Sequence, residues 1–538
     1  MGLRFKEHPM RPTRRQFTSL LSGALLSPLI APPVGADDSL GIPASHLGPA
    51  SSFSFEDVSR EALRLARIPY RERDAPNPLL EQIDYDSYQR IRYRPDRTLH
   101  KDTPQPVQLF HLGNSVQDPV RISLVADGQA REILYRRDLF DIPDGHPALQ
   151  LPENIGFAGF RIMDRSLKSD WFSMIGASYF RSAMPHDQYG VSARGIAVNT
   201  AGQTKEEFPK FVHLWLEWSP HSQNPMMVYA LLDGPSVTGA YKMAISRTIP
   251  AGEAGNCEMQ VEASVYLRAD VERVGIAPFS SMFWYGEAQV QHPRDWRPEV
   301  HDSDGIALLT GEGERIWRPL RNPPRNSTNV FGDHNPKGFG LLQRDRLFEH
   351  YLDDGVFYEK RPSVWVEPLG EWDDGAVHLV EMPTGEETWD NIVVYWCPKN
   401  FEKAGQSRTF SYRLLWLDNI PFPKELAFTV GTWTGIGGQP GLGYSERNPH
   451  KTKVVIDFEG SGLAGLSRTD GVQFIVSSSR GNISNVANYP VVGRTERWRA
   501  VFDVEAAGVE AIDLRGYLTR ANRALSETWL YQLNPIAK

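Results

Sequence analysis

Val107-Gln108-Leu109-Phe110-His111, followed by Val120-Arg121-Ile122-Ser123-Leu124, sets the pattern of this chain. Val107, Leu109 and His111 alternate with their neighbours, and every second residue of a β-strand faces the same side of its sheet. Gly, Pro, Asn or Asp bounds each run, as at the ends of successive antiparallel strands. This segment therefore predicts an all-β protein.

The same pattern extends outward in both directions. It recurs in Ala130–Tyr135, Phe157–Met163, Phe211–Trp218, Lys242–Ile249 and Met259–Leu267. These runs predict a large antiparallel β-sandwich over residues 53–397, preceded by one helix from Phe55 to Ile68 with a single apolar face. Residues 398–409 are rich in Lys, Asn and Gly and predict a linker. Shorter runs after it predict an immunoglobulin-like β-sandwich over residues 410–538.

Composition supports this organisation. A chain of 538 residues exceeds one ordinary hydrophobic core, and 45 Gly with 40 Pro suit a turn-rich β protein. The formal charge of −8 argues against nucleic acid as the partner and is compatible with a neutral ligand rich in hydroxyl groups.

The N-terminus has the features of an export signal. Arg14-Arg15 precedes an apolar run from Leu20 to Ile30 and the small-residue site Val34-Gly35-Ala36. We interpret residues 1–36 as a twin-arginine signal peptide, which predicts a periplasmic protein. Residues 37–52 are polar and predict a disordered leader. Because no later run reaches about 18 apolar residues, we expect no stable membrane insertion.

Cysteine and histidine give no sign of a metal or cofactor. Cys257 and Cys397 are the only cysteines, and their spacing leaves both a disulfide and two free thiols open. His301, His334 and His350 form no metal-binding spacing with nearby acids. Asp302-x-Asp304-Gly305 differs from a calcium loop in the position of its glycine and lacks the bidentate glutamate. We therefore expect neither a metal nor a cofactor.

Two acidic clusters lie among aromatic residues and arginines. They are His301-Asp302-Ser303-Asp304-Gly305 and Glu386-Glu387-Thr388-Trp389-Asp390-Asn391. Aromatic faces, arginines and paired carboxyl groups are the chemistry of a carbohydrate cleft, in which one carboxyl group serves as acid and the other as base. Asp390, beside Trp389 and an apolar strand, is our candidate acid because apolar burial would raise its pKa. A strand-entry turn at Asp390-Asn391 is the alternative.

Asp302 is the candidate base. Asp304 lies nearer the Gly305 turn, and a turn hydrogen bond is the alternative function for both aspartates. Trp284, Tyr285 and Trp365 are candidate sugar-stacking residues, although strand aromatics commonly fill a sandwich core. Alternation allows only one residue of an adjacent pair such as Trp365-Val366 to face a cleft.

A long ordered set of motifs resembles one family. It includes Gly176-Ala177-Ser178-Tyr179-Phe180-Arg181, Arg297-Pro298-Glu299-Val300-His301-Asp302, Arg361-Pro362-Ser363-Val364-Trp365-Val366-Glu367-Pro368 and Glu387-Thr388-Trp389-Asp390-Asn391-Ile392-Val393. Together these are similar to the bacterial periplasmic glucan biosynthesis proteins G and D. The twin-arginine signal favours the D branch.

The resemblance implies a galactose-mutarotase-like sandwich, an immunoglobulin-like domain and a role in making osmoregulated periplasmic glucans. It implies that Asp390 is the general acid and Asp302 the base end of the proton path. It also implies that Tyr358, Arg361 and Glu387 line the same cleft. A β-1,2-glucan oligosaccharide or polysaccharide is the implied partner, and a homodimer stays open.

Three functions remain open at this stage. The first is an inverting endo-β-1,2-glucanase, and the second is a transglycosylase that cyclises β-1,2-glucan through an α-linkage of the α-1,6 type. The third is a non-catalytic glucan-binding assembly factor, against which the presence of both Asp302 and Asp390 argues.

Overall fold

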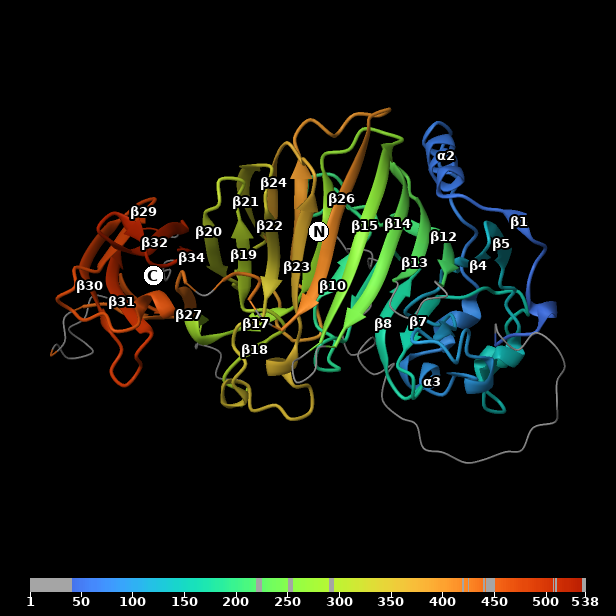
Figure 1. Cartoon of the computed structure of the whole chain (residues 1–538), viewed down its shortest axis with the longest axis horizontal. Coiled ribbons are helices and arrows are strands. Elements are labelled where there is room, and N and C mark those ends of the chain that lie inside the picture. The colour runs from blue at the N-terminus through green and yellow to red at the C-terminus, as the bar shows by residue number, and fades with distance from the viewer. Residues whose placement is uncertain are drawn as a thin grey trace, which may run out of the picture.

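The computed structural model describes residues 41–534, except 219–224, 250–254, 290–294, 419, 424, 439–440, 442–449, 507 and 509. The proposed signal peptide lies outside the described residues. Strands dominate the described chain, and the predicted all-β class is confirmed. Figure 1 shows a broad central sandwich with a smaller β unit beside it at the C-terminal end.

The largest sheet of the described chain has 16 strands. In sheet order they are β1 (Ser51–Ser52), β5 (Gln129–Glu132), β4 (Arg121–Ala126), β12 (Lys210–Glu217), β13 (Met226–Asp233), β14 (Val237–Thr248), β15 (Asn256–Leu267), β26 (Ser407–Leu417), β23 (Ser363–Leu369), β22 (Gly338–Leu342), β19 (Gly305–Leu309), β20 (Arg315–Pro319), β34 (Thr528–Leu533), β32 (Ile512–Arg520) and β29 (Gln473–Ser478), with β33 (Arg523–Ala524) beside β32. Its pairs are antiparallel except β4 with β12 and β20 with β34.

A second sheet of ten described strands packs against the first. In order they are β21 (Ser327–His334), β24 (Asp374–Glu381), β25 (Ile392–Pro398), β16 (Val274–Ser281), β10 (Ser192–Arg194), β9 (Tyr179–Ser182), β8 (Asp170–Ile175), β7 (Gly159–Met163) and β3 (Val107–Phe110), with β11 (Ala197–Val198) beside β16. One apolar core draws residues from both sheets. Phe279 of β16, for example, stacks on Phe339 of β22 with ring centroids 5.9 Å apart. The predicted sandwich is thus confirmed.

Small elements flank these sheets. Two short pairs are β2 (Arg92–Tyr93) with β6 (Phe140–Asp141), and β17 (Phe283–Tyr285) with β18 (Val300–His301). The predicted first helix is α2 (Phe55–Ala66), and α3 spans Tyr85–Tyr88. Ser54 caps α2 by accepting from the Asp57 amide, and Val58 and Ala62 bury its apolar face.

The predicted disordered leader is wrong from residue 41 onward. Ile42 and Leu47 are buried, and β1 pairs with β5 at the edge of the large sheet. Although this segment is polar overall, its two apolar residues Ile42 and Leu47 pack into the core of the sandwich.

The predicted domain boundary is also wrong. β26 lies between β15 and β23 in the large sheet, so the first sandwich continues to Leu417 (Figure 1). Residues 398–409 connect β25 of one sheet to β26 of the other and bury Phe401. A turn between two sheets requires the same Gly, Lys and Asn residues as a linker between two domains.

The C-terminal unit is itself a sandwich. Its separate sheet has the order β27 (Phe428–Ile436), β28 (Lys451–Glu459), β31 (Arg497–Glu505) and β30 (Asn482–Pro490). This sheet and the strands β34, β32 and β29 enclose a second apolar core. The parallel pair of β20 with β34, in which Trp317 is opposite Trp529, joins the two sandwiches through one sheet.

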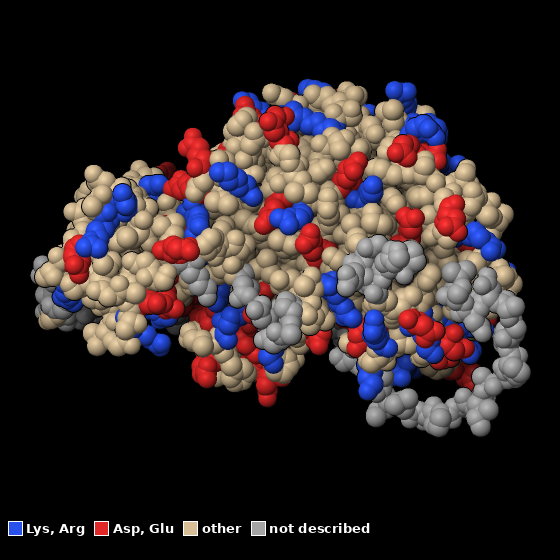
Figure 2. Space-filling view, in the orientation of Figure 1, with Lys and Arg blue, Asp and Glu red and all other residues tan. Residues whose placement is uncertain are grey.

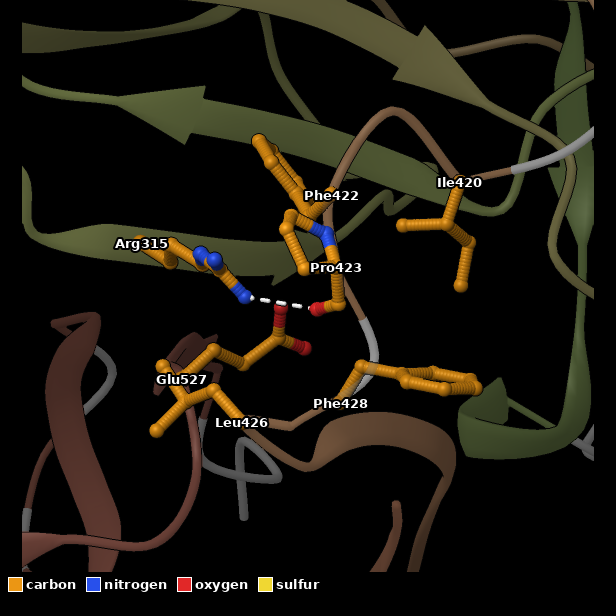
Figure 3. Close-up of a pocket in the computed structure, with 7 residues that line it drawn as sticks. All are labelled: Arg315, Ile420, Phe422, Pro423, Leu426, Phe428 and Glu527. Carbon is orange, nitrogen blue, oxygen red and sulfur yellow. Dashed lines mark hydrogen bonds between the residues drawn. The ribbon is translucent and has the colours of Figure 1, made fainter. Parts of the chain in front are cut away.

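The true connection between the sandwiches follows β26. Figure 3 shows Arg315 of β20 donating to the carbonyl of Pro423, at 2.9 Å, beside Phe422 and Glu527. Phe422 also packs edge-on against Trp365, with ring centroids 5.1 Å apart. Phe422 and Pro423 of the connecting segment therefore pack against strands β20 and β23 of the large sheet.

Candidate active site

Asp302 lies immediately after β18 and is completely buried. Its amide donates to the carbonyl of Met282 at 2.9 Å, which fixes it beside the end of β16. The nearest cation is Arg361, whose Nε lies 3.4 Å from Oδ1 of Asp302. Burial lowers the pKa of Arg361 to about 10, so the guanidinium is still charged at neutral pH and stabilises the Asp302 carboxylate.

Asp390 lies just before β25 and is half-buried. The Ser280 hydroxyl donates to Oδ2 of Asp390 at 3.2 Å. The next residue, Asn391, is buried, and its amide donates to the carbonyls of Phe283 and Met382 at 2.9 Å each. Its oxygen accepts from the Phe283 amide at 2.8 Å. Asn391 therefore fixes the backbone, and the Asp390 carboxyl group stays accessible.

The two aspartates border the same strand end. Ser280, at the end of β16, binds Asp390, while Ser281 lies 2.9 Å from the hydroxyl of Ser303, the neighbour of Asp302. A buried guanidinium lies within electrostatic range of both sides, because Arg181 is attracted by the charge of Asp390 and repelled by that of Arg361. Arg181 stacks on Tyr189, 4.2 Å from its ring centroid.

Tyr358 and Glu387 are in direct contact, although Tyr358 and Arg361 are both 1% exposed, so their predicted place in the lining of the cleft stays a prediction. The Tyr358 hydroxyl donates to Glu387 at 2.6 Å, and Arg297 donates to the same carboxylate at 2.6 Å. Arg297 also binds Asp295 and Asp353. One guanidinium thus holds together three loops that are far apart in the sequence. Sequence reasoning missed Arg297 because its partners become neighbours only in the fold.

The chain matches the protein family described as "Periplasmic glucan biosynthesis protein, MdoG" over residues 53–533. It is 44% identical over 97% of its length to Glucans biosynthesis protein D 2 of Ralstonia nicotianae, covering 98% of that protein. It is 44% identical to Glucans biosynthesis protein D of Stenotrophomonas maltophilia over 91% of each chain, and 42% identical to that of Xylella fastidiosa over 97% and 98%. The chain belongs to the periplasmic glucan biosynthesis protein family.

The aromatic residues of this family member divide into buried and exposed groups. Trp365 is 1% exposed and belongs to the second core, so the prediction that it stacks on a sugar is wrong. Tyr285 is also buried and donates to the carbonyl of Arg297 at 3.0 Å, which excludes it as a stacking platform. Trp284 is half-buried and is the accessible residue of its pair.

The sequence analysis did not propose two exposed tryptophans as sugar-stacking residues. Trp296 is 68% exposed and Trp389 is 41% exposed, and they lie next to Arg297 and Asp390, respectively. Position could have found Trp389, which is adjacent to the candidate Asp390, whereas Trp296 is adjacent to Arg297, which was itself missed. Figure 2 shows acidic and basic side chains gathered together below the position of β17 and β18, where the surface of this family member is rich in charge.

His301 and Asp304 have structural roles beside the site. Asp304 accepts from the amide of Asp345 at 2.7 Å and from that of Arg344, as expected of a turn carboxylate. His301 binds Glu299 at 3.0 Å and Gln343 at 3.1 Å. Burial alone would lower the pKa of His301, but the Glu299 bond and the Asp304 charge raise it to about 9.

Cys257 and Cys397 are free cysteines, so the disulfide left open by the sequence is not formed. Among the described residues, no helix is long and apolar enough to cross a membrane.

Proposed function

We propose that this protein is a periplasmic enzyme that cleaves β-1,2-glucan chains internally with inversion at the anomeric carbon. The family, with its periplasmic and glucan-related description, supports the compartment and the substrate class. The reaction class rests on one observation: two carboxyl groups in different environments border one strand end. An inverting glycosidase needs such a division between acid and base.

Each aspartate suits one role. Asp390 is half-buried and is the carboxyl group that a leaving glycosidic oxygen can reach. Asp302 is buried with the Arg361 guanidinium 3.4 Å away, so a base at this position would have a cationic partner. Because Asp302 is 0% exposed, it receives the proton through an intervening hydroxyl or water, not from direct contact with the nucleophile.

Transfer to a sugar hydroxyl is the second candidate, and Glu387 and Trp389 favour it. Both lie within three residues of Asp390, and both reach the surface, with Glu387 24% exposed and Trp389 41% exposed. A carboxylate beside an indole can hold an acceptor sugar near the reacting carbon, where proximity would let it compete with water. Inversion with a sugar acceptor would close a β-1,2 chain by one α-linkage.

The test is incubation of the mature protein with linear β-1,2-glucan, followed by product mass and NMR. Short reducing oligosaccharides with initially α-configured ends would support hydrolysis. A product lighter by one water than the linear chain with the same number of glucose units, released together with the leaving fragment of the donor chain and showing a single α signal, would support cyclisation. Unchanged glucan bound to the protein would favour the assembly factor and reject the enzyme.

A further inference from the structure

We propose that Glu299, Asp345 and His350 form a binding site for a divalent transition-metal ion, with Zn²⁺ as its best-suited occupant. One ligand atom from each of these side chains lies within 4.8 Å of the others. The site adjoins the proposed cleft but uses none of its residues, so it stands independently of the proposed reaction.

The donor set determines the class of metal. Two carboxylates and one imidazole suit Zn²⁺, whereas Ca²⁺ and Mg²⁺ prefer oxygen ligands alone. Glu299 is buried, Asp345 is partly buried, and His350 is exposed, so the site is closed on the protein side and open to solvent on the other. Three protein ligands with one open position is a common zinc arrangement.

The required movement is small. Ligands of a tetrahedral zinc ion with bonds of about 2.1 Å lie about 3.4 Å apart, so the longest separation, at most 4.8 Å, needs to shorten by up to roughly 1.4 Å. His350 ends the short 3-10 helix η8 (Phe348–His350) and already binds Asp345 through Nδ1. An exposed single-turn helix is the element that can make this adjustment.

Local charge favours a cation. The carboxyl groups of the region are Glu287, Glu299, Asp304 and Asp345, and the imidazoles are His301 and His350. The neighbouring arginines have their direct ion pairs elsewhere, because Arg344 binds Glu527 at 2.6 Å and Arg346 pairs with Asp418 at 3.4 Å, although Arg346 also interacts electrostatically with Asp345. Four carboxyl groups therefore lie around two imidazoles at this site.

Asp345, one of the three ligands, also borders a cavity that contains an unsatisfied hydroxyl group. Asp345 and Asp304 line a narrow cavity between the two sandwiches, together with Thr429 of β27. Thr429 is 2% exposed, yet its hydroxyl has no hydrogen-bond partner within the described part of the chain. Water entering with a hydrated ion would satisfy this hydroxyl.

A bound ion would join β18, which leads to Asp302, to the loop that supplies Tyr358 and Arg361. Glu299 directly precedes β18, which leads to Asp302, while Asp345 and His350 begin the segment that leads to Tyr358. Gln343 already bridges these parts, because its amide donates to the Tyr351 hydroxyl and the Tyr358 carbonyl at 3.0 Å each. Binding would therefore fix this loop against β18.

The test is titration of metal-free mature protein with ZnCl₂ and, separately, CaCl₂ by calorimetry, together with thermal unfolding. We expect saturable Zn²⁺ binding, a higher Tm with Zn²⁺, and weaker binding of Ca²⁺. His350→Gln and Asp345→Asn should each weaken Zn²⁺ binding at least tenfold. Because His350 is largely exposed, its variant should fold normally even if Asp345→Asn does not.

His334→Gln is the matched control. His334 binds Asp374 at 2.9 Å in an exposed pair, and this pair has no third ligand in the described chain. Its replacement should leave Zn²⁺ affinity unchanged. The proposal is overturned if the wild-type protein shows no saturable Zn²⁺ binding, if His350→Gln binds as the wild type does, or if Ca²⁺ binds more tightly than Zn²⁺.

Discussion

At the residue scale, neighbouring polar residues divide structural and chemical roles. Asn391 holds three backbone groups, whereas the adjacent Asp390 makes one side-chain bond and stays accessible. Asp304 accepts turn amides, whereas Asp302 faces Arg361. Turn contacts therefore account for Asp304 and Asn391, and the catalytic interpretation of Asp302 and Asp390 stays a prediction. Sequence alone could not assign these roles, because the assignment depends on which side chain points inward.

Asn391→Ala should destabilise the protein by about 2–4 kcal/mol, because it leaves buried backbone groups of Phe283 and Met382 without partners. Urea unfolding would measure this change. Asn482→Ala, at an exposed position of β30, is the control and should change stability by less than about 0.5 kcal/mol. A loss for Asn391→Ala as small as the control's would show that Asn391 does not anchor the site.

Trp296→Ala should change glucan binding, whereas Trp365→Ala should change stability. Trp296 is 68% exposed, so its loss should weaken glucan binding and leave stability nearly unchanged. Trp365 is 1% exposed, so its loss should cost about 3–5 kcal/mol of stability. Thermal unfolding and glucan calorimetry on both variants would test this. Equal glucan affinity in Trp296→Ala and the wild type would reject Trp296 as a stacking platform.

At the element scale, the alternating runs predicted strands reliably, whereas the connections between strands did not predict the domain boundary. The runs at Val107 and Phe211 became β3 and β12; β12 largely alternates between more and less buried positions, whereas β3 is buried on both faces. The connection at 398–409 was misread, because a crossover between two sheets and a linker between domains have the same composition. Of Trp284 and Tyr285, alternation allows only one to face outward but does not say which one.

Two histidines on buried strand surfaces make stability depend on pH. Burial lowers the pKa of His111 to about 4 and that of His213 to about 3, while an unfolded histidine titrates near 6.5. Protons therefore bind the unfolded chain first as the pH falls. The stabilisation is complete above pH 6.5 and is lost progressively below it, by about 2 kcal/mol for each ring at pH 5.

His213→Gln isolates one of these contributions, since glutamine can still bind the Ser123 hydroxyl, which lies 2.8 Å from His213. Unfolding free energies at pH 7 and pH 5 should differ less in this variant than in the wild type. An unchanged or larger difference would contradict the assignment of His213 as a neutral buried ring.

At the scale of the whole molecule, the two sandwiches share a sheet and a buried ion pair. β20 pairs with β34, and Arg344 binds Glu527 through two hydrogen bonds, of 2.6 and 3.0 Å. Both side chains are almost fully buried, at 4% and 2% exposure. The sequence predicted two units. It could not predict the contacts that join them, because the residues that make these contacts lie far apart in the chain.

Arg344→Ala should therefore weaken the junction. Leaving Glu527 buried without its partner costs about 3–5 kcal/mol. We expect the wild-type protein to unfold in one calorimetric transition and Arg344→Ala to unfold in two, with the C-terminal sandwich separating first. Arg315→Ala, which removes one partly exposed contact with Pro423, should retain the single transition. Two transitions in the wild type would show that the sandwiches are independent.

The most direct test of the central claim compares Asp390→Asn with the wild-type protein on linear β-1,2-glucan. The amide keeps the shape and the Ser280 contact but cannot donate a proton to the leaving oxygen. We predict that turnover falls at least about 100-fold, while the folded state and the affinity for glucan oligosaccharides are retained. Turnover within about tenfold of the wild type, at equal affinity, would contradict the assignment of Asp390 as the acid catalyst.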